Sequence, residues 1–308
     1  MLSFIYCLDE NYNKQSLCSI YSLLENINEE IKIYLIHKNP ESIKMLPKII
    51  TEHTNLSSIK VFEKILKDVH YPKLNDAHVS EATYYRLNLQ NYFFEEDDML
   101  IYLDSDVIFI NNPLTALKEQ ANFLKNSNYV ISAKSEETLS EHGKDVLGLT
   151  SKNYFNAGVM IINVNKWKNL KVSDRLYESL EKLGEKIIFW DQDVLNHYFD
   201  GQYLELDQKL NYQVRMEDNN FLKSSLKSEI LLHYSGKFKP WTVKGASKEE
   251  AKYFQDIYRV IFEEKYLISY NYKVNALKDF LVIIFTLRIF KMQFKTSFIS
   301  IVVKSFFK

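Results

Sequence analysis

Glycine is scarce in this chain, which has only seven glycines among 308 residues. None of them forms a GxGxxG or GxxxxGK[ST] pattern. Many α/β proteins bind nucleotide phosphates with such loops, whose backbone amides surround the phosphate oxygens. The sequence excludes that way of binding phosphate. If a diphosphate binds here, a metal ion and Lys or Arg side chains must neutralise its charge.

The chain also contains few cysteines and carries almost no net charge. The two cysteines, Cys7 and Cys18, are too few for a disulfide framework and too far apart for a CxxC site. This usage favours a reducing compartment. The formal net charge of −1 gives the whole chain no preference for polyanions, so we expect no nucleic-acid partner.

The sequence also lacks an apolar segment long enough to span a membrane. The apolar run at residues 280–287 ends at Arg288, well short of the roughly 20 residues that a spanning helix needs. The N-terminal residues "MLSFIYCLDE" have neither the basic start nor the apolar length of a secretory signal, and they predict a first core strand. We therefore expect a cytoplasmic protein.

Apolar residues make up 46% of the chain, enough for the large core of one α/β domain or two small ones. Short β-branched runs alternate with helix-period segments, a pattern typical of a doubly wound, mostly parallel sheet flanked by helices. The predicted strands are residues 3–8, 31–36, 59–63, 99–103, 129–133, 155–164 and a last one from 229. The predicted helices are residues 14–27, 43–50 and 80–93, a long one after Trp167, one from Trp190 and one from Ser247, with a polar loop at 134–151.

Two aspartates follow one of these strands, in the stretch "IYLDSDVIFI" at residues 101–110. Doubly wound sheets bind ligands at the carboxyl ends of their strands, where Asp9, Asp104 and Asp106 all fall. Carboxylate oxygens suit Mg²⁺ or Mn²⁺, and His233 at the end of another predicted strand tilts the choice toward Mn²⁺. Lys239, six residues later, is placed to meet phosphate oxygens that the metal leaves free.

Asp9 and several other polar residues that could carry a function also have structural explanations. Aspartate often caps turns and helices, so Asp9 can simply end a strand and Asp191 can begin a helix. Arg86 can form an ion pair on a helix surface, and Asn156 with Gly158 can shape a bulge.

Six segments of the chain carry a further pattern: "FIYCLDENY", "ATYYRLNL", "YLDSDVIF", "YFNAGVMIIN", "WDQDVLN" and "HYSGKFKPW", extending over about residues 1–245. Taken together and in this order, they resemble the family 8 retaining glycosyltransferases, which include bacterial lipopolysaccharide galactosyl- and glucosyltransferases and, more distantly, glycogenin. The resemblance implies a GT-A fold and a UDP-sugar donor held through Mn²⁺, with Asp104, Asp106 and His233 as the metal ligands.

The resemblance also assigns donor-binding roles. Asp9 and Asn11 match the residues that read uracil, and Tyr12 matches a residue that stacks on the base. The residues expected along the rest of the donor are Ser105 between the two aspartates, Gly236 and Lys239 over the diphosphate, and Arg86, Asn156, Asp191 and Gln192 around the sugar.

Gln192 matches the position nearest the anomeric carbon. An amide is a poor nucleophile, so we favour same-face attack by the acceptor hydroxyl over a covalent intermediate, for which Asp191 is the nearest carboxylate. The expected reaction moves galactose or glucose to a glycan, glycolipid or glycoprotein acceptor. On the acceptor side, the acidic residue that some relatives carry is replaced here by Ser135, with Glu136 beside it, and His78 matches a sugar-contacting position.

The end of the chain is strongly basic. Residues 273–308 carry seven basic residues and one acid, a local charge of +6, among many phenylalanines. We expect a glycosyltransferase domain at residues 1–265 and a helical tail at 266–308 that binds an anionic membrane surface on the inner face of the cell membrane. The alternative for the tail is a helix packed on the domain or on a second subunit.

Two other functions remain open from the sequence. A haloacid-dehalogenase-like phosphatase also carries a DxD after an apolar strand, although there the first aspartate lies near the start of its domain. A non-catalytic sugar-nucleotide-binding subunit of a polysaccharide assembly complex is the second alternative.

Overall fold

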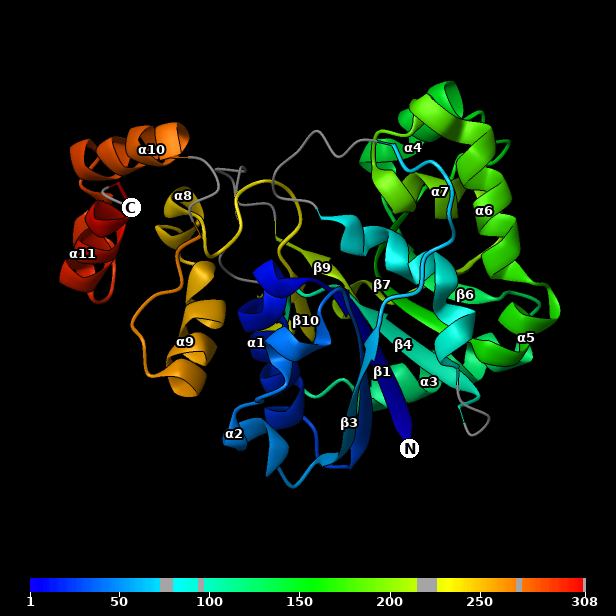
Figure 1. Ribbon diagram of the computed structural model, residues 1–308, viewed down its shortest axis with the longest axis horizontal. Coiled ribbons are helices and arrows are strands. Elements are labelled where there is room, and N and C mark those ends of the chain that lie inside the picture. The colour runs from blue at the N-terminus through cyan, green and yellow to red at the C-terminus, as the bar shows by residue number, and fades with distance from the viewer. Residues whose placement is uncertain (73–79, 94–96, 215–225, 270–272, 307–308) are drawn as a thin grey trace.

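The computed structural model describes residues 1–72, 80–93, 97–214, 226–269 and 273–306. Within these residues the centre of the molecule is a seven-stranded sheet in the order β3-β2-β1-β4-β7-β6-β8, covered by helices on both faces (Figure 1). Its strands are β1 (Leu2–Leu8), β2 (Ile31–His37), β3 (Leu56–Glu63), β4 (Met99–Leu103), β6 (Ile131–Ser135), β7 (Phe155–Asn163) and β8 (Leu204–Glu205). Neighbouring strands are parallel except at β7, which is antiparallel to both β4 and β6. The predicted α/β class with a mostly parallel sheet is confirmed.

Alternating side chains of the strands face two separate cores. On β1, Phe4 and Leu8 belong to one apolar cluster, and Ile5 and Cys7 belong to the other. The main helices of the first cluster are α1 (Asn13–Glu25) and α3 (Leu114–Asn126), and those of the second are α6 (Val172–Leu183) and α7 (Trp190–Phe199). Because both faces are covered, all nine residues of β7 are buried.

A second, three-stranded sheet extends the first beyond the end of β4. It consists of β5 (Val107–Phe109), β10 (Leu231–His233) and β9 (Tyr212–Gln213), with β10 in the middle. β10 is antiparallel to β5 and parallel to β9, so that His233 pairs with Val107 on one side and with Gln213 on the other. This pairing brings a distant part of the chain next to the two aspartates that follow β4.

Several predicted elements differ in the structure. The helix expected at residues 43–50 is wrong: two short segments, η2 (Pro40–Ile43) and α2 (Lys48–Thr51), stand in its place. Pro47 explains the break, because proline has no N–H to donate and disfavours a helical conformation at the residue before it.

The helix expected at residues 80–93 is a 3-10 helix, η3 (Glu81–Tyr92), interrupted at Asn88. Ser80 is its N-cap, as predicted, and accepts a hydrogen bond from the Ala82 N–H. The loop expected at 134–151 contains short helical segments. These and the remaining short elements are η1 (Glu10–Tyr12), η4 (Glu137–Leu139), α4 (Ser140–His142), the π-helical turn η5 (Gly143–Leu147), α5 (Val164–Asn169), η6 (Gly184–Lys186), η7 (Gln208–Leu210) and η8 (Leu226–Ser228).

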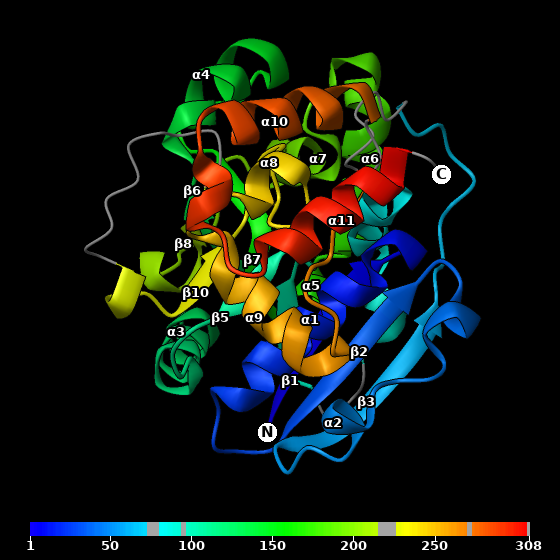
Figure 2. The ribbon, with the colours of Figure 1, turned by 90° about the vertical axis from the view of Figure 1, so that its left-hand side faces the viewer.

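The C-terminal region is helical and lies to one side of the sheet. Its elements are α8 (Val243–Ala246), α9 (Ala251–Phe262), α10 (Lys273–Phe285), η9 (Arg288–Lys291) and α11 (Lys295–Phe306). Figure 2 shows α10 and α11 on the outer side of α8 and α9. Ile283, Phe298 and Val302 of these outer helices form an apolar cluster with Val243 and Tyr266. One face of the tail therefore packs on the rest of the chain.

Candidate functional site

A cavity of about 780 Å³ opens where β1 and β4 end and β7 begins. Because β7 is antiparallel to β4, its first residues lie at the same edge of the sheet as the residues after β4. Asp104 N–H donates to the Gly158 carbonyl at 2.8 Å, which fixes this junction. Asp9 and the Asp104–Asp106 segment follow strand ends, as predicted.

Asp104, Asp106 and His233 each offer a ligand atom within 4.8 Å of the others. The three-stranded sheet places His233 beside Asp106, because the Tyr234 N–H donates to the Asp106 carbonyl at 3.0 Å. Asp106 and His233 are buried, whereas the Asp104 side chain is 28% exposed toward the cavity. The three residues form a candidate site for a divalent metal ion.

Two further observations fit a cation at this place. Asp106 Oδ1 is buried, accepts no hydrogen bond and lies 3.3 Å from His233 Nε2. Gly158 lies directly against two of these residues, since a Cβ added there would come 2.3 Å from His233 Cε1 and 2.9 Å from Asp104 Oδ2. Two carboxylates and one imidazole make a donor set that suits a divalent metal. The residues present fit the divalent ion that the resemblance implies.

Lys239 lies against Asp106. Its Nζ is 2.5 Å from Asp106 Oδ2 and donates to the Tyr234 carbonyl at 2.5 Å. Burial disfavours the Asp106 carboxylate, but the neighbouring Lys239 and His233 hold its pKa well below the usual range. Asp106 is therefore a carboxylate at neutral pH, able to share its charge between the lysine and a metal ion.

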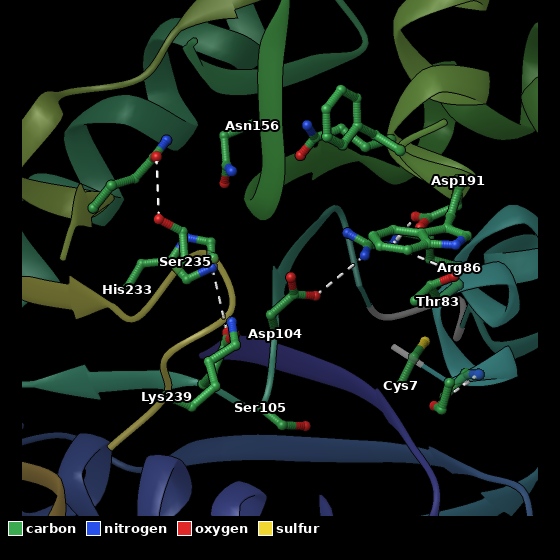
Figure 3. Close-up of a pocket in the computed structure, with 18 of the residues that line it drawn as sticks. Cys7, Thr83, Arg86, Asp104, Ser105, Asn156, Asp191, His233, Ser235 and Lys239 are labelled. Atoms are coloured by element: carbon green, nitrogen blue, oxygen red, sulfur yellow. Dashed lines mark hydrogen bonds and ion pairs between the residues drawn. The ribbon is translucent and has the colours of Figure 1, made fainter. Parts of the chain in front are cut away.

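Arg86 occupies the other side of Asp104, as Figure 3 shows. Its Nη2 lies 3.3 Å from Asp104 Oδ1, its Nε pairs with Asp191, and its Nη1 donates to the Ala157 carbonyl at 2.5 Å. The guanidinium also lies 4.4 Å from the centre of the Tyr102 ring. Only 5% of Arg86 is exposed, so it is a buried link between two carboxylates and not a helix-surface residue.

Asp191 is buried in the first turn of α7. Burial raises its pKa to about 7, while the Arg86 guanidinium beside it acts in the opposite direction. Gln192, the next residue, accepts a hydrogen bond from the Ala157 N–H at 3.0 Å through Oε1. Both side chains line the cavity.

Asp193 is a structural residue that the sequence reasoning missed. It is fully buried, and its Oδ2 accepts hydrogen bonds from the Ile188 and Phe189 N–H groups at 2.8 Å each. Its Oδ1 accepts from Tyr154 at 2.7 Å and lies 2.9 Å from His142 Nε2. The only hint of this role in the sequence was that "WDQD" contains a second aspartate, Asp193. These contacts fix the turn that points Asp191 and Gln192 into the cavity.

An Asp193→Asn variant is expected to lower the free energy of unfolding by about 3 kcal/mol, because the new NH₂ group would face N–H and O–H donors and leave them unsatisfied. Urea denaturation measures the change. Glu181→Gln, at an exposed position of α6, is the control and should stay within about 0.5 kcal/mol of the wild type. An Asp193→Asn variant as stable as that control would contradict the structural role.

The predicted uracil-binding residues divide into two groups. Tyr12 lines the cavity and packs edge-on against Trp241, with ring centres 6.1 Å apart. Asp9 caps η1 by accepting from the Asn11 N–H at 2.9 Å, and Asn11 is exposed. Asp9 and Asn11 sit in the turn between Leu8 and Tyr12 and are not among the described residues that line the cavity.

The remaining donor-binding candidates do line the cavity: Ser105, Asn156, Gly236 and Lys239. Gly236 has a φ of 82°, a left-handed conformation that glycine adopts without strain, so it permits the tight loop after β10. Asn156 Oδ1 accepts hydrogen bonds from the Gly158 N–H at 3.1 Å and from Asn211 Nδ2 at 3.0 Å. Asn211 gave no signal in the sequence.

On the acceptor side, Ser135 and its neighbour Glu136 lie differently with respect to the cavity. Ser135 donates to Glu205 at 2.5 Å and is not among the described lining residues. Glu136 is buried, lines the cavity and accepts hydrogen bonds from Thr138 at 2.9 Å and Gln213 at 2.6 Å. His78 lies outside the described residues.

Comparison with known proteins identifies the family. The sequence profile of glycosyl transferase family 8 matches residues 3–245, most of the chain. The chain belongs to glycosyltransferase family 8. The family expected from the resemblance is confirmed: the protein is an enzyme that transfers sugars, and its family is a retaining one. This assignment replaces both the phosphatase and the non-catalytic alternatives.

Individual relatives agree with the family. The enzyme is 30% identical over 271 residues to the lipopolysaccharide 1,2-glucosyltransferase of Escherichia coli, covering 82% of this chain and 76% of that one. It is 31% identical over 175 residues to the lipopolysaccharide 1,3-galactosyltransferase of Salmonella typhimurium, covering 54% of this chain and 50% of that one.

Among solved structures, the galactosyltransferase LgtC in complex with donor and acceptor sugar analogs has a similar fold. The TM-score is 0.66 at 20% identity, and the match covers 85% of this chain and 96% of that one. The predicted GT-A fold is confirmed by this likeness.

Proposed function

We propose that this family 8 enzyme transfers a hexose, galactose or glucose, from a UDP-sugar to a glycan, glycolipid or glycoprotein acceptor and requires Mn²⁺, which Mg²⁺ can replace. The observation that carries the proposal is the cluster of Asp104, Asp106 and His233 within 4.8 Å, on the wall of a cavity large enough for a nucleotide sugar. The absence of a glycine loop adds support, because the diphosphate then needs a cation.

Asp104, Asp106 and His233 would hold the metal. When bound, a divalent ion neutralises the negative charge that develops on the departing diphosphate. Lys239 would supply a second positive charge to the phosphate oxygens, and Gly236 lets the loop that carries it approach the cavity closely. Lys239 is already held near the site by its ion pair with Asp106 at 2.5 Å, so little reorganisation is needed.

We assign the uracil end of the donor to Tyr12, Asp9 and Asn11, with Ser105 beside the metal ligands. Tyr12 presents its side chain to the cavity from the first turn after β1. The Asp9 carboxylate keeps one oxygen beyond its bond to the Asn11 N–H, and that oxygen would accept a hydrogen bond from the base. Because Asp9 and Asn11 are not among the described residues that line the cavity, the base must extend beyond those lining residues to contact them.

The sugar end is assigned to Arg86, Asn156, Asp191 and Gln192. Gln192 Oε1 accepts a backbone hydrogen bond at 3.0 Å, so this oxygen is held in place and is a poor nucleophile. Asp191 is paired with Arg86, which makes its carboxylate less available for attack as well. These contacts favour same-face attack by the acceptor hydroxyl, with the leaving phosphate oxygen taking its proton.

UDP release from UDP-galactose and UDP-glucose, with and without Mn²⁺ and over a panel of glycan acceptors, tests this function. We expect release from one of the two donors, dependent on Mn²⁺ and stimulated by an acceptor. A chain that released UDP from neither donor in the presence of Mn²⁺ would contradict the proposal.

We further propose that residues 266–308 form a tail that attaches residues 1–265, the glycosyltransferase domain, to an anionic membrane on the cytoplasmic side. No helix of the described residues is both long and apolar enough to cross a membrane. The face of the tail that is turned away from α8 exposes large apolar side chains: Leu281, Phe285, Leu287 and Phe290. Basic residues lie close to them in the sequence, at Lys278, Arg288, Lys291 and Lys295, and Lys295 Nζ lies 5.2 Å from the centre of the Phe290 ring. Exposed apolar residues among basic ones are typical of a membrane-surface segment.

The double variant Phe285→Ser with Phe290→Ser is expected to bind anionic vesicles at least about 100-fold more weakly, since each phenylalanine loses roughly 1.5 to 3 kcal/mol of apolar burial. Vesicles of phosphatidylglycerol and co-sedimentation measure the effect. Phe123→Ser, an exposed phenylalanine of α3, is the matched control and should bind like the wild type. Equal vesicle binding by the double variant would refute attachment through this face.

A further inference from the structure

Asn211 lies behind the metal candidates, away from the cavity. It directly precedes β9 and is fully buried, and β9 runs beside β10, which ends at His233. Asn211 Oδ1 is 2.9 Å from His233 Nδ1, and Asn211 Nδ2 donates to Asn156 Oδ1 at 3.0 Å. Its side chain therefore joins a predicted metal ligand to a predicted sugar-binding residue.

The orientation of both amides follows from a single backbone group. The Gly158 N–H lies 3.1 Å from one terminal atom of Asn156, and because an N–H can only donate, that atom is the oxygen. The same oxygen faces Asn211, which must therefore present its NH₂ group. The Asn211 oxygen is left to face His233 Nδ1, and a hydrogen bond forms there when Nδ1 carries the proton.

The other nitrogen of the ring then has a lone pair in the neutral imidazole. His233 Nε2 lies 3.3 Å from Asp106 Oδ1, the buried oxygen that accepts no hydrogen bond. A lone pair and a carboxylate oxygen facing each other repel unless a proton or a metal ion lies between them, and a bound metal ion would take the place of that proton. A proton fixed on Nδ1 thus leaves Nε2 ready to bind a metal.

We propose that Asn211 is a positioning residue that keeps the proton of His233 on Nδ1 and its Nε2 lone pair toward the metal. The inference rests on the proposed metal site. Hydrogen-bond partners behind metal-binding histidines fix their tautomer, and their loss typically costs about 10- to 100-fold in metal affinity. Through Asn156 the same hydrogen bonds tie the metal ligand to the sugar end of the site.

The tautomer is measured in the metal-free wild-type chain by long-range ¹H–¹⁵N NMR of labelled histidine side chains, with a His233→Gln variant to assign the signal. We expect a proton on Nδ1 of His233. A ring without a proton on Nδ1 would overturn the inference. This measurement needs neither metal nor donor, so it is separate from the proposed function, whose failure appears as a wild-type chain that binds no Mn²⁺.

Metal affinity gives the second test. An Asn211→Ala variant is expected to bind Mn²⁺ about 10- to 100-fold more weakly than the wild type in an electron paramagnetic resonance titration. Asn163→Ala is the matched control, because Asn163 is a buried asparagine at the far end of β7 that caps α5. It is expected to lose stability and to keep its Mn²⁺ affinity. An Asn211→Ala variant with wild-type affinity would overturn the positioning role.

Discussion

An Asp106→Asn variant is expected to release UDP from UDP-sugar about 1,000-fold more slowly than the wild type. The change removes one charged ligand of the proposed metal and the carboxylate that pairs with Lys239 at 2.5 Å. If the loss of the ion's charge costs roughly 4 kcal/mol of transition-state stabilisation, the rate falls about 1,000-fold. UDP release at saturating Mn²⁺ measures the effect.

The same exchange at a surface position controls for the substitution itself. Asp98 is exposed and pairs with Lys125 at 3.2 Å, away from the cavity, so Asp98→Asn should leave turnover unchanged. Circular dichroism and urea unfolding establish that both variants are folded. Turnover by Asp106→Asn at the wild-type rate, with or without Mn²⁺, would remove the proposed role of this residue.

A Gly158→Ala variant is expected to lose at least about 100-fold in activity and in Mn²⁺ affinity. The added methyl group would lie 2.3 Å from His233 Cε1 and 2.9 Å from Asp104 Oδ2, so both side chains must move. Displacement of about 1 Å at a reacting site typically costs about 100-fold. Mn²⁺ titration and UDP release, measured on the same preparation, record the two losses.

Gly184→Ala separates this effect from the general cost of replacing glycine. Gly184 has a φ of 50° and no atom within 4 Å of an added Cβ, so alanine there strains the backbone without touching the site. We expect that variant to be less stable, by about 1 to 3 kcal/mol, and to bind Mn²⁺ normally. Normal Mn²⁺ binding by Gly158→Ala would show that the ion does not lie against β7.

The sequence predicted the parts of the site that depend on local patterns. Asp104 and Asp106 follow a short apolar strand, and the alternation of strands and helices was enough to place them at the carboxyl edge of a sheet. Arg86, Asp191 and Gln192 came from the family resemblance, and the structure brings all three to the same cavity.

Residues whose partners are distant in the chain gave no signal. Asn211 is separated by 22 residues from His233 and by 55 from Asn156. The pairing of β9 with β10 brings Asn211 to His233, and Asn156 reaches it from β7. The antiparallel direction of β7 was equally hidden, because a strand that is apolar along its whole length has the same pattern in both directions. Gly158 lies against the metal candidates because β7 begins at the edge of the sheet where β4 ends.

The tail shows a similar limit. Its composition indicated basic charge and many apolar residues, but not which of them face outward. The structure buries Ile283 and Phe298 against α8 and the segment after α9, and it exposes Phe285 and Phe290. Packing on the domain, which the sequence offered as an alternative to membrane binding, accounts for one face of the tail only.

The most direct measurement is a crystal structure of the chain with Mn²⁺ and UDP, with anomalous diffraction data collected at the manganese absorption edge. We expect one strong anomalous peak within bonding distance of Asp104, Asp106 and His233 and next to the UDP phosphates. Bound UDP with no anomalous peak at these three side chains would contradict the proposed metal site.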